Sequence, residues 1–228
     1  MAAKKRLVLV GAGETAEMAY EYFTDDSDYD VVAFAVEREH LKGGDFLGLP
    51  VVCLDSLADR YPPADCSAFI AVSYTGLNSA RKRICYQVES MGYELASYVS
   101  SRSFIGRGVV VGPNAFIMEQ CSVQHHGRVG KGAVLWCGCQ IAHRSSIGDF
   151  AWLAPGVVVS GFCSIGERSF LGSGAILIDG VSVAEKTAVG AGALVRKALT
   201  EPEMLYRADN RLTPMGDERF KEFMEGNI

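Results

Sequence analysis

A sixfold repeat of aliphatic residues runs through the second half of this 228-residue chain. Every sixth residue from Val99 to Val195 is valine, isoleucine or leucine, without exception. The residue two places earlier is small in most repeats, from Ser97 to Ala193. An α-helix repeats every ~3.6 residues and a strand every two, whereas a sixfold period is typical of short strands and tight turns around a three-sided prism. The repeat therefore predicts a parallel β-helix with ~18 residues per coil and about five coils.

Glycine follows the aliphatic position in seven repeats, and we expect a turn there to need backbone angles that other residues resist. The small residues are expected to let the chain close at the corners of the prism. Cys121, Cys139 and Cys163 fall in this small column, where they are expected to supply volume rather than chemistry. The seven glycines are Gly106, Gly112, Gly130, Gly148, Gly166, Gly172 and Gly190.

The first part of the chain alternates strand and helix signals, which predicts a small Rossmann-like α/β layer of βαβ units. Residues 1–97 are expected to form this domain, residues 98–199 the β-helix, and residues 200–228 a tail with a short helix at Glu218–Met224. In the first domain, strands are expected at Arg6–Val10, Tyr29–Val36 and Ser67–Val72, and helices at Glu14–Phe23 and Leu77–Met91.

Charge and composition exclude several classes of function. The net charge of −5 argues against nucleic acid as the main partner. No apolar run reaches membrane-spanning length, and the stretch Leu7–Val10 is too short for an export signal. The seven cysteines contain no C-x-x-C pair, and their odd number and scattered spacing are typical of reduced thiols. We therefore expect a cytoplasmic protein without membrane insertion and without a structural zinc site.

A glycine-rich segment follows the first expected strand and opens the first helix. Gly11, Gly13 and Ala16 fit the pattern G-x-G-x-x-A, which lets a phosphate or ribose approach the backbone. Glu37 ends the second expected strand, where an acidic residue accepts ribose hydroxyls. A domain of fewer than 100 residues favours a single nucleotide or nucleotide-sugar over NAD. A structural turn that binds nothing is the alternative.

The three histidines of the repeat region lie outside both interior columns. His125 and His143 are 18 residues apart, which places them on one side of consecutive coils, and His126 and Arg144 follow them. A neutral imidazole in a cleft of a rigid prism can act as a general base. The alternative is hydrogen bonding at the surface or between subunits. No histidine lies five residues from either one, as in the zinc site of the carbonic anhydrases built on such a prism, so no metal is expected.

Three further motifs lie in the two expected domains: Ile141-Ala-His-Arg-Ser-Ser-Ile-Gly148, Phe69-Ile-Ala-Val-Ser73 and Asn78-Ser-Ala-Arg-Lys-Arg83. With these motifs, and with a glycine-rich βαβ domain that leads into hexapeptide repeats, the chain resembles the nucleotide-sugar acyltransferases of the hexapeptide-repeat superfamily. This group includes the sialic-acid O-acetyltransferase-like proteins and the N-acetyltransferases that act on UDP- or GDP-amino sugars. The likeness spans nearly the whole chain.

The resemblance implies a left-handed prism and a homotrimer with active sites in clefts between neighbouring prisms. It implies that His143 is the general base, and His125 is the second catalytic candidate. The implied ligands are a nucleotide-linked amino sugar and an acyl-CoA, with acetyl-CoA expected. The nucleotide-sugar residues are Gly11, Gly13, Glu14, Thr15, Glu37, Arg38 and Ser73, and the acyl-CoA residues are Trp152, Ser173, Ala191, Arg196 and Lys197.

Three positions depart from the family pattern. Arg144 stands where some members have an acidic residue after the catalytic histidine, which leaves the orientation of the imidazole open. Trp152 replaces a histidine that meets the CoA end, and packing between subunits is its alternative role. Glu37-Arg38 stands where an Asp pair is common, which leaves the nucleobase open. Arg196 and Lys197 are either partners of the CoA phosphates or solvated cations.

The function expected from these residues and this resemblance is N-acylation of a nucleotide-linked amino sugar for bacterial surface polysaccharide or glycan synthesis. The alternatives are a sugar O-acetyltransferase, an NAD-dependent enzyme that uses the β-helix only to oligomerise, and a scaffold that binds nucleotide-sugars without catalysis.

Overall fold

The computed structural model describes residues 4–201, 203–205 and 212–214. The chain divides into two compact units, which we describe separately. The first unit comprises the chain up to Ser73 together with Ala80–Tyr98. The second unit comprises Tyr74–Ser79 and the chain from Val99 onward. The helix expected at Glu218–Met224 lies outside the described residues. No helix in the described part of the chain is long and apolar enough to cross a membrane.

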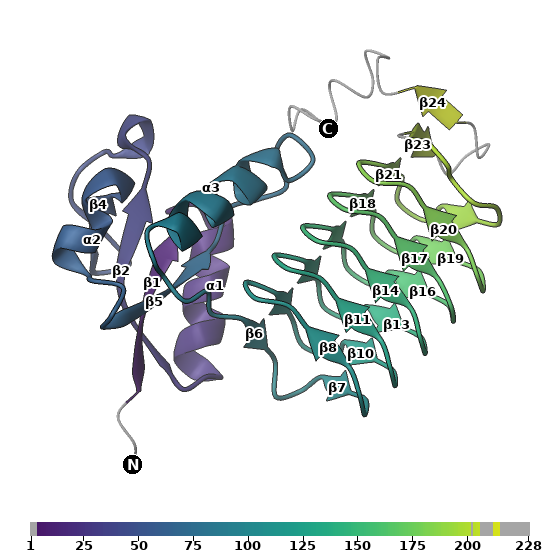
Figure 1. Ribbon diagram of the computed structural model, residues 1–228, viewed down its shortest axis with the longest axis horizontal. Helices are drawn as coiled ribbons and strands as arrows, with labels where there is room; N and C mark the ends of the chain where they lie inside the picture. Colours follow the sequence, from purple (N-terminus) through teal and green to yellow (C-terminus); the bar gives the residue numbers. More distant parts are fainter. Residues whose placement is uncertain (1–3, 202, 206–211, 215–228) are drawn as a thin grey trace. The chain divides into compact units, whose positions relative to one another are not determined.

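The first unit is built on a five-stranded sheet with the order β3-β4-β2-β1-β5 (Figure 1). All neighbours pair in parallel except β3, which is antiparallel to β4. Strand β5 is buried along its whole length, as is typical of a parallel strand covered on both faces. The elements are β1 (Lys5–Val10), α1 (Glu14–Asp25), β2 (Tyr29–Val36), η1 (Arg38–His40), β3 (Asp45–Phe46), β4 (Leu49–Cys53), η2 (Leu54–Ser56), α2 (Leu57–Arg60), β5 (Cys66–Ile70) and α3 (Ser79–Ser90).

The second unit is a left-handed parallel β-helix, as the repeat and the resemblance led us to expect. From β6 to β22 its strands are two residues long, and each strand from β7 to β19 pairs in parallel with the strand 18 residues further on. The last two strands are longer: β23 pairs in parallel with β21, and β24 is antiparallel to β23. Figure 1 shows the coils stacked in order along the prism.

Three sheets form the faces of the prism. Face one holds β7 (Phe104–Ile105), β10 (Ser122–Val123), β13 (Gln140–Ile141), β16 (Val158–Val159), β19 (Ile176–Leu177) and β22 (Leu194–Val195). Face two holds β8 (Val110–Val111), β11 (Arg128–Val129), β14 (Ser146–Ile147), β17 (Ser164–Ile165) and β20 (Ser182–Val183). Face three holds β6 (Tyr98–Val99), β9 (Phe116–Ile117), β12 (Val134–Leu135), β15 (Trp152–Leu153), β18 (Phe170–Leu171), β21 (Ala188–Val189), β23 (Glu203–Leu205) and β24 (Leu212–Pro214).

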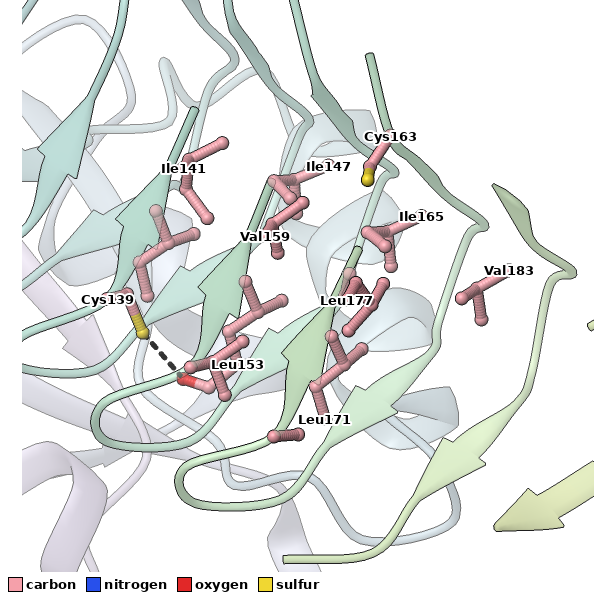
Figure 2. Close-up of a cluster of buried hydrophobic side chains, with 14 of the residues drawn as sticks. Cys139, Ile141, Ile147, Leu153, Val159, Cys163, Ile165, Leu171, Leu177 and Val183 are labelled. Carbon is pink, nitrogen blue, oxygen red and sulfur yellow. Dashed lines mark hydrogen bonds between the residues drawn. The ribbon is translucent and has the colours of Figure 1, made fainter. Parts of the chain in front are cut away.

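The aliphatic column fills the interior of the prism, as predicted. In Figure 2, Ile147, Leu153 and Val159 point inward from the three faces toward one another. These side chains are at most 1% exposed, and the small column beside them is buried as well. Removing this apolar area from water supplies the main stabilisation of the unit.

The cysteine and serine side chains of the small column also donate hydrogen bonds. Cys163 Sγ lies 3.1 Å from the carbonyl oxygen of Ile178, and Ser145 Oγ lies 2.7 Å from that of Ser160. A dashed line in Figure 2 joins Cys139 Sγ to the Leu153 carbonyl oxygen, 3.8 Å away. Burial raises the pKa of the Cys163 thiol. These side chains therefore provide volume, as predicted, and they also donate to backbone carbonyl groups of the next coil.

The glycines after the aliphatic column have a different role from the one predicted. None of the seven has a positive φ; the left-handed residue of each corner lies two places later, at Gly132, Gly156 or Arg144 for example. A Cβ on Gly148 would lie 2.6 Å from the Ile165 carbonyl oxygen of the next coil. Glycine is needed at this place because successive coils approach closely, so the prediction about turn angles was wrong for this position.

Candidate functional site

One corner of the β-helix carries a column of polar residues. The turn between β13 and β14 contains His143, and the 18-residue coil repeats this position along the prism. The column on successive coils is His125, His143, Gly161, Asp179 and Lys197. Stacked coils lie about 4.8 Å apart, so neighbouring members of the column are within contact distance.

Two ring contacts orient the His143 imidazole, and a hydrogen bond holds its backbone. Its ring stacks on His125, with centroids 5.6 Å apart and planes 10° apart, and meets the Phe162 ring edge-on at 5.0 Å. Its backbone N–H donates to Gln124 Oε1 at 3.1 Å. Within the described part of the chain, neither imidazole nitrogen has a hydrogen-bond partner. The imidazole is thus oriented by ring packing, without an acidic residue at position 144.

His143 extends over Gly161 toward Asp179. A Cβ placed on Gly161 would lie 2.7 Å from His143 Cε1, 2.9 Å from Nε2 and 3.2 Å from Asp179 Oδ1. The same carboxylate oxygen accepts the Gly161 backbone N–H at 2.8 Å. Neither Gly161 nor Asp179 belongs to the site residues predicted from the sequence. Their spacing of 18 and 36 residues from His143 is the signal that identifies them.

The predicted acyl-CoA residues fall into three groups. Ser173 and Ala191 lie exposed on consecutive coils of a second corner, between faces three and one. Arg196 and Lys197 are exposed on the His143 corner. Trp152 is only 3% exposed. One β-helix therefore does not bring Ser173 and Ala191 to the same corner as His143.

Trp152 packs against aromatic residues of its own chain. Its ring lies 5.4 Å from Tyr74 and 6.0 Å from Trp136, centroid to centroid, and Tyr74 also lies 4.9 Å from Phe170. This packing leaves little of Trp152 available to a ligand.

The segment Tyr74–Ser79 belongs to the β-helix unit although it precedes the repeats by some twenty residues. Arg168 holds it by donating from Nε to the Leu77 carbonyl oxygen at 2.9 Å and from Nη2 to that of Gly76 at 3.0 Å. No periodicity in the sequence predicts that this segment belongs to the β-helix unit or that Arg168 donates hydrogen bonds to it.

The two glycines of the G-x-G-x-x-A segment serve different purposes. Gly11 has φ +135°, and a Cβ there would lie 2.5 Å from the Ala71 carbonyl oxygen, so strand β1 requires glycine at its end. No atom lies within 4 Å of a Cβ placed on Gly13, which caps helix α1. Glu14 is exposed and Thr15 is buried at the start of that helix. The space beside Gly13 is therefore open to a ligand.

Glu37 is held by a residue that the sequence motifs do not assign to the site. Arg83 in α3 donates from both terminal nitrogens to the two carboxylate oxygens of Glu37, at 2.7 and 2.8 Å. This hydrogen bonding lowers the pKa of the Glu37 carboxyl. The pair leaves further lone pairs of the carboxylate available to hydroxyl donors. The neighbouring Arg38 points to Asp55 instead, at 3.2 Å.

A buried arginine fixes the backbone that leads to Ser73. The Arg81 guanidinium is fully buried and donates to the carbonyl oxygens of Ile70 and Val72, at 2.9 and 3.0 Å. Burial lowers the pKa of Arg81 to about 10, so the group stays charged at neutral pH. It sets the direction of the chain after β5.

The described residues contain one group with the spacing of metal ligands, formed by Glu37, Glu39 and His40. Its atoms are largely solvent-exposed, and Arg83 already engages both oxygens of Glu37. The donor set does not favour a metal over this ion pair.

The fold is that of a left-handed β-helix of hexapeptide repeats joined to a parallel α/β unit. No family model matches the chain, and no curated protein matches it. Among solved structures, PerB from Caulobacter crescentus, in complex with CoA and GDP-perosamine, is 24% identical with a TM-score of 0.81, covering 91% of this chain and 97% of that one. The acetyltransferase domain of PglB from Neisseria gonorrhoeae, in complex with acetyl coenzyme A, is 23% identical with a TM-score of 0.81, covering 92% and 99%. WeeI from Acinetobacter baumannii is 20% identical with a TM-score of 0.65, covering 92% and 100%.

At these identities the comparisons establish a shared fold over nearly the full length of each chain. They confirm the fold class predicted from the repeat and from the family resemblance.

Proposed function

We propose that the protein transfers an acyl group, with acetyl preferred, from acyl-CoA to the amino group of a nucleotide-linked sugar. The observation that carries this proposal is the His143 imidazole, oriented by His125 and Phe162 and free at both nitrogens within the described residues. The shared fold supports it, because PerB binds CoA and GDP-perosamine and the PglB domain binds acetyl coenzyme A.

In the proposed reaction, His143 removes a proton from the acceptor amine. The nitrogen lone pair then attacks the thioester carbonyl carbon, and the C–N bond forms as the carbonyl electrons move to oxygen. The tetrahedral intermediate collapses with cleavage of the C–S bond, and the CoA thiolate leaves and takes up a proton. A positioned base of this kind contributes roughly 10²- to 10⁴-fold to the rate.

The active site is proposed to form between two copies of the chain in a homotrimer. Ser173 and Ala191 lie on a different corner from His143, with the filled prism interior between the corners. A cleft that holds all three residues therefore needs a second β-helix. Phe162 and Ile178 border the His143 corner and are 59% and 41% exposed, which a neighbouring prism would cover. Arg196 and Lys197 are proposed to meet the CoA phosphates in this cleft.

The nucleotide is proposed to bind the first unit beside Gly13 and Thr15, with Glu37 accepting hydroxyl hydrogen bonds and Ser73 close to the sugar. Glu14 and Glu17 in the first turn of α1 disfavour a phosphate at that helix end and favour a hydroxyl or a base N–H donor. An acyl-CoA donor and seven free thiols are typical of a protein of the cytoplasm. The product is proposed to be used in the synthesis of a glycan or a surface polysaccharide.

The decisive experiment measures thiol release from acetyl-CoA against a panel of UDP-, GDP- and dTDP-linked amino sugars. We expect release with at least one member, formation of the corresponding amide, and a trimer by sedimentation. Nucleotide-sugar binding without thiol release would make the protein a scaffold. Release that requires a sugar hydroxyl would make it an O-acetyltransferase, and a strictly monomeric active protein would remove the proposed cleft.

A further inference from the structure

The His143 imidazole and the Asp179 carboxylate both approach Gly161 closely, a base and an acid on neighbouring coils. His143 Nε2 and Asp179 Oδ1 each lie within 3.2 Å of the point that a Cβ of residue 161 would occupy. They are therefore separated by no more than the span of two hydrogen bonds. Within the described residues they form no ion pair with each other. A hydrogen-bond donor that enters from the exposed side of Asp179 can contact both groups.

Glycine at position 161 is not required by the backbone. Gly161 has no positive φ. A second corner provides the comparison, because Asp149 Oδ1 accepts the Lys131 backbone N–H at 2.9 Å in the same way that Asp179 Oδ1 accepts that of Gly161. Lys131 carries a side chain in this arrangement. The hydrogen bond from the backbone N–H to the carboxylate thus tolerates a side chain on the donor residue. Glycine at position 161 instead leaves room for the His143 imidazole, which extends over it.

The Asp179 carboxylate forms no ion pair within the described residues. The residue is exposed, and its Oδ1 accepts from a neutral backbone N–H. In the described part of the chain it has no ion pair with Lys197, the next residue of the column. Its carboxylate is therefore available to a cationic group that enters beside His143.

We propose that His143 and Asp179, separated by Gly161, form the site that receives the protonated amino group of the acceptor and select amines over hydroxyls. This inference rests on the proposed function and names the acceptor group for it. Asp179 binds the ammonium as a positioning residue, and His143 takes the proton. A sugar hydroxyl carries no charge for the carboxylate to hold.

The proton balance follows from this arrangement. The bound R–NH₃⁺ gives one proton to His143, which passes it to solvent, and the resulting amine attacks the thioester carbonyl carbon. The adduct nitrogen then gives a second proton to His143, which delivers it to the leaving CoA thiolate as the C–S bond breaks. The amide product is neutral, so Asp179 holds it less strongly than the ammonium and the product is released.

The test compares Asp179→Asn with the matched control Asp149→Asn. Both changes keep an amide oxygen that accepts the backbone N–H of the preceding coil, but only the first removes charge beside His143. The probes are the UDP-, GDP- and dTDP-linked amino sugars, each paired with the counterpart that carries a hydroxyl in place of the amino group. Binding is measured by calorimetry, and kcat and KM by thiol release.

We expect the wild type and Asp149→Asn to bind the preferred amino sugar at least about 10-fold more tightly than its hydroxyl counterpart. Asp179→Asn should abolish this preference and raise KM about 10- to 100-fold, with a smaller change in kcat. Asp179→Glu keeps the charge and should retain a preference for the amine, and thermal unfolding confirms that each variant is folded.

An active wild type whose amine preference and KM do not change in Asp179→Asn would overturn this proposal and leave the acyltransferase function intact. A wild type that releases no thiol with any amino sugar would overturn both. Should Asp179→Asn fail to fold, loss of the amine preference in a folded Asp179→Glu would overturn the role of the charge.

Discussion

His125 and His143 stack face to face, with ring centroids 5.6 Å apart and planes 10° apart. The repeat places them identically on consecutive coils, yet their surroundings differ. His143 extends over Gly161 and meets the Phe162 ring, whereas His125 is exposed beside His126. The two histidines are equivalent in the sequence repeat, but the residues of the next coil give them different surroundings.

Replacing His143 by alanine is expected to lower kcat by about 100-fold or more, because the imidazole beside Gly161 and Asp179 is that of His143. His125→Ala should cost less than about tenfold, since it removes only the stacking partner. Thiol release measures both effects, and sedimentation checks that both variants keep the assembly of the wild type. A larger loss in His125→Ala would assign the base to His125 instead.

Arg83→Met is expected to raise KM for the nucleotide-sugar several-fold while leaving kcat nearly unchanged. The substitution removes the two hydrogen bonds that orient the Glu37 carboxylate, which is the proposed acceptor for the sugar hydroxyls. Steady-state kinetics with the amino-sugar panel measures the effect. Lys186→Met, which breaks an exposed pair with Glu185 on the β-helix, is the control and should not change KM.

The same variant has a small and pH-dependent effect on stability. Arg83 lowers the pKa of Glu37, so the pair stabilises the folded state above the ordinary carboxyl pKa and loses this contribution as the pH falls through the lowered value. We expect wild type and Arg83→Met to differ by less than about 1 kcal/mol at pH 7, because the arginine is largely exposed. The difference should vanish in acid. A difference that grew as the pH fell would contradict the assigned cause.

The interior of the β-helix could be predicted from the sequence almost residue by residue. Period six specifies which side chain points inward, independently of any other part of the chain, and the buried column from Ile117 to Val195 follows it. Strand β2 coincides with the predicted Tyr29–Val36 for a related reason, since a buried parallel strand is a local run of apolar residues.

The contacts of the candidate site could be predicted only in part. The coil repeat places Asp179 in the column of His143, but the direction in which the imidazole leans depends on the rings around it. The pairing of Arg83 with Glu37 joins residues 46 positions apart, and Arg168 reaches the Leu77 carbonyl from 91 positions away. Such contacts arise from tertiary approach, and no local pattern encodes them.

Gly11→Ala and Gly13→Ala are expected to have opposite consequences. At Gly11 a Cβ would lie 2.5 Å from the Ala71 carbonyl oxygen on a backbone with φ +135°, so alanine should destabilise the protein by about 1–3 kcal/mol or more. At Gly13 the space is open and φ is −125°, so the fold should be retained while nucleotide-sugar affinity falls. Urea unfolding and calorimetric titration separate the two effects. Unchanged affinity in Gly13→Ala would mean that the segment is a structural turn.

Substitutions at two glycines of the β-helix separate two reasons for needing glycine, which are close approach between coils and the backbone angle of a turn. In Gly148→Ala the new Cβ would meet the Ile165 carbonyl oxygen at 2.6 Å, and the stacked backbone can move little, so we expect a loss of about 1–3 kcal/mol or more. Gly156 has φ +69° with no atom within 4 Å of its Cβ position, and Asn114 occupies the equivalent place of another corner with φ 57°. Gly156→Asn should therefore cost less than about 1 kcal/mol, because asparagine adopts this conformation more readily than other side chains. Urea unfolding of the two variants provides the measurement. A loss in Gly156→Asn as large as that in Gly148→Ala would show that the left-handed backbone at residue 156 requires glycine, and a negligible loss in Gly148→Ala would show that the coils can separate to admit a methyl group.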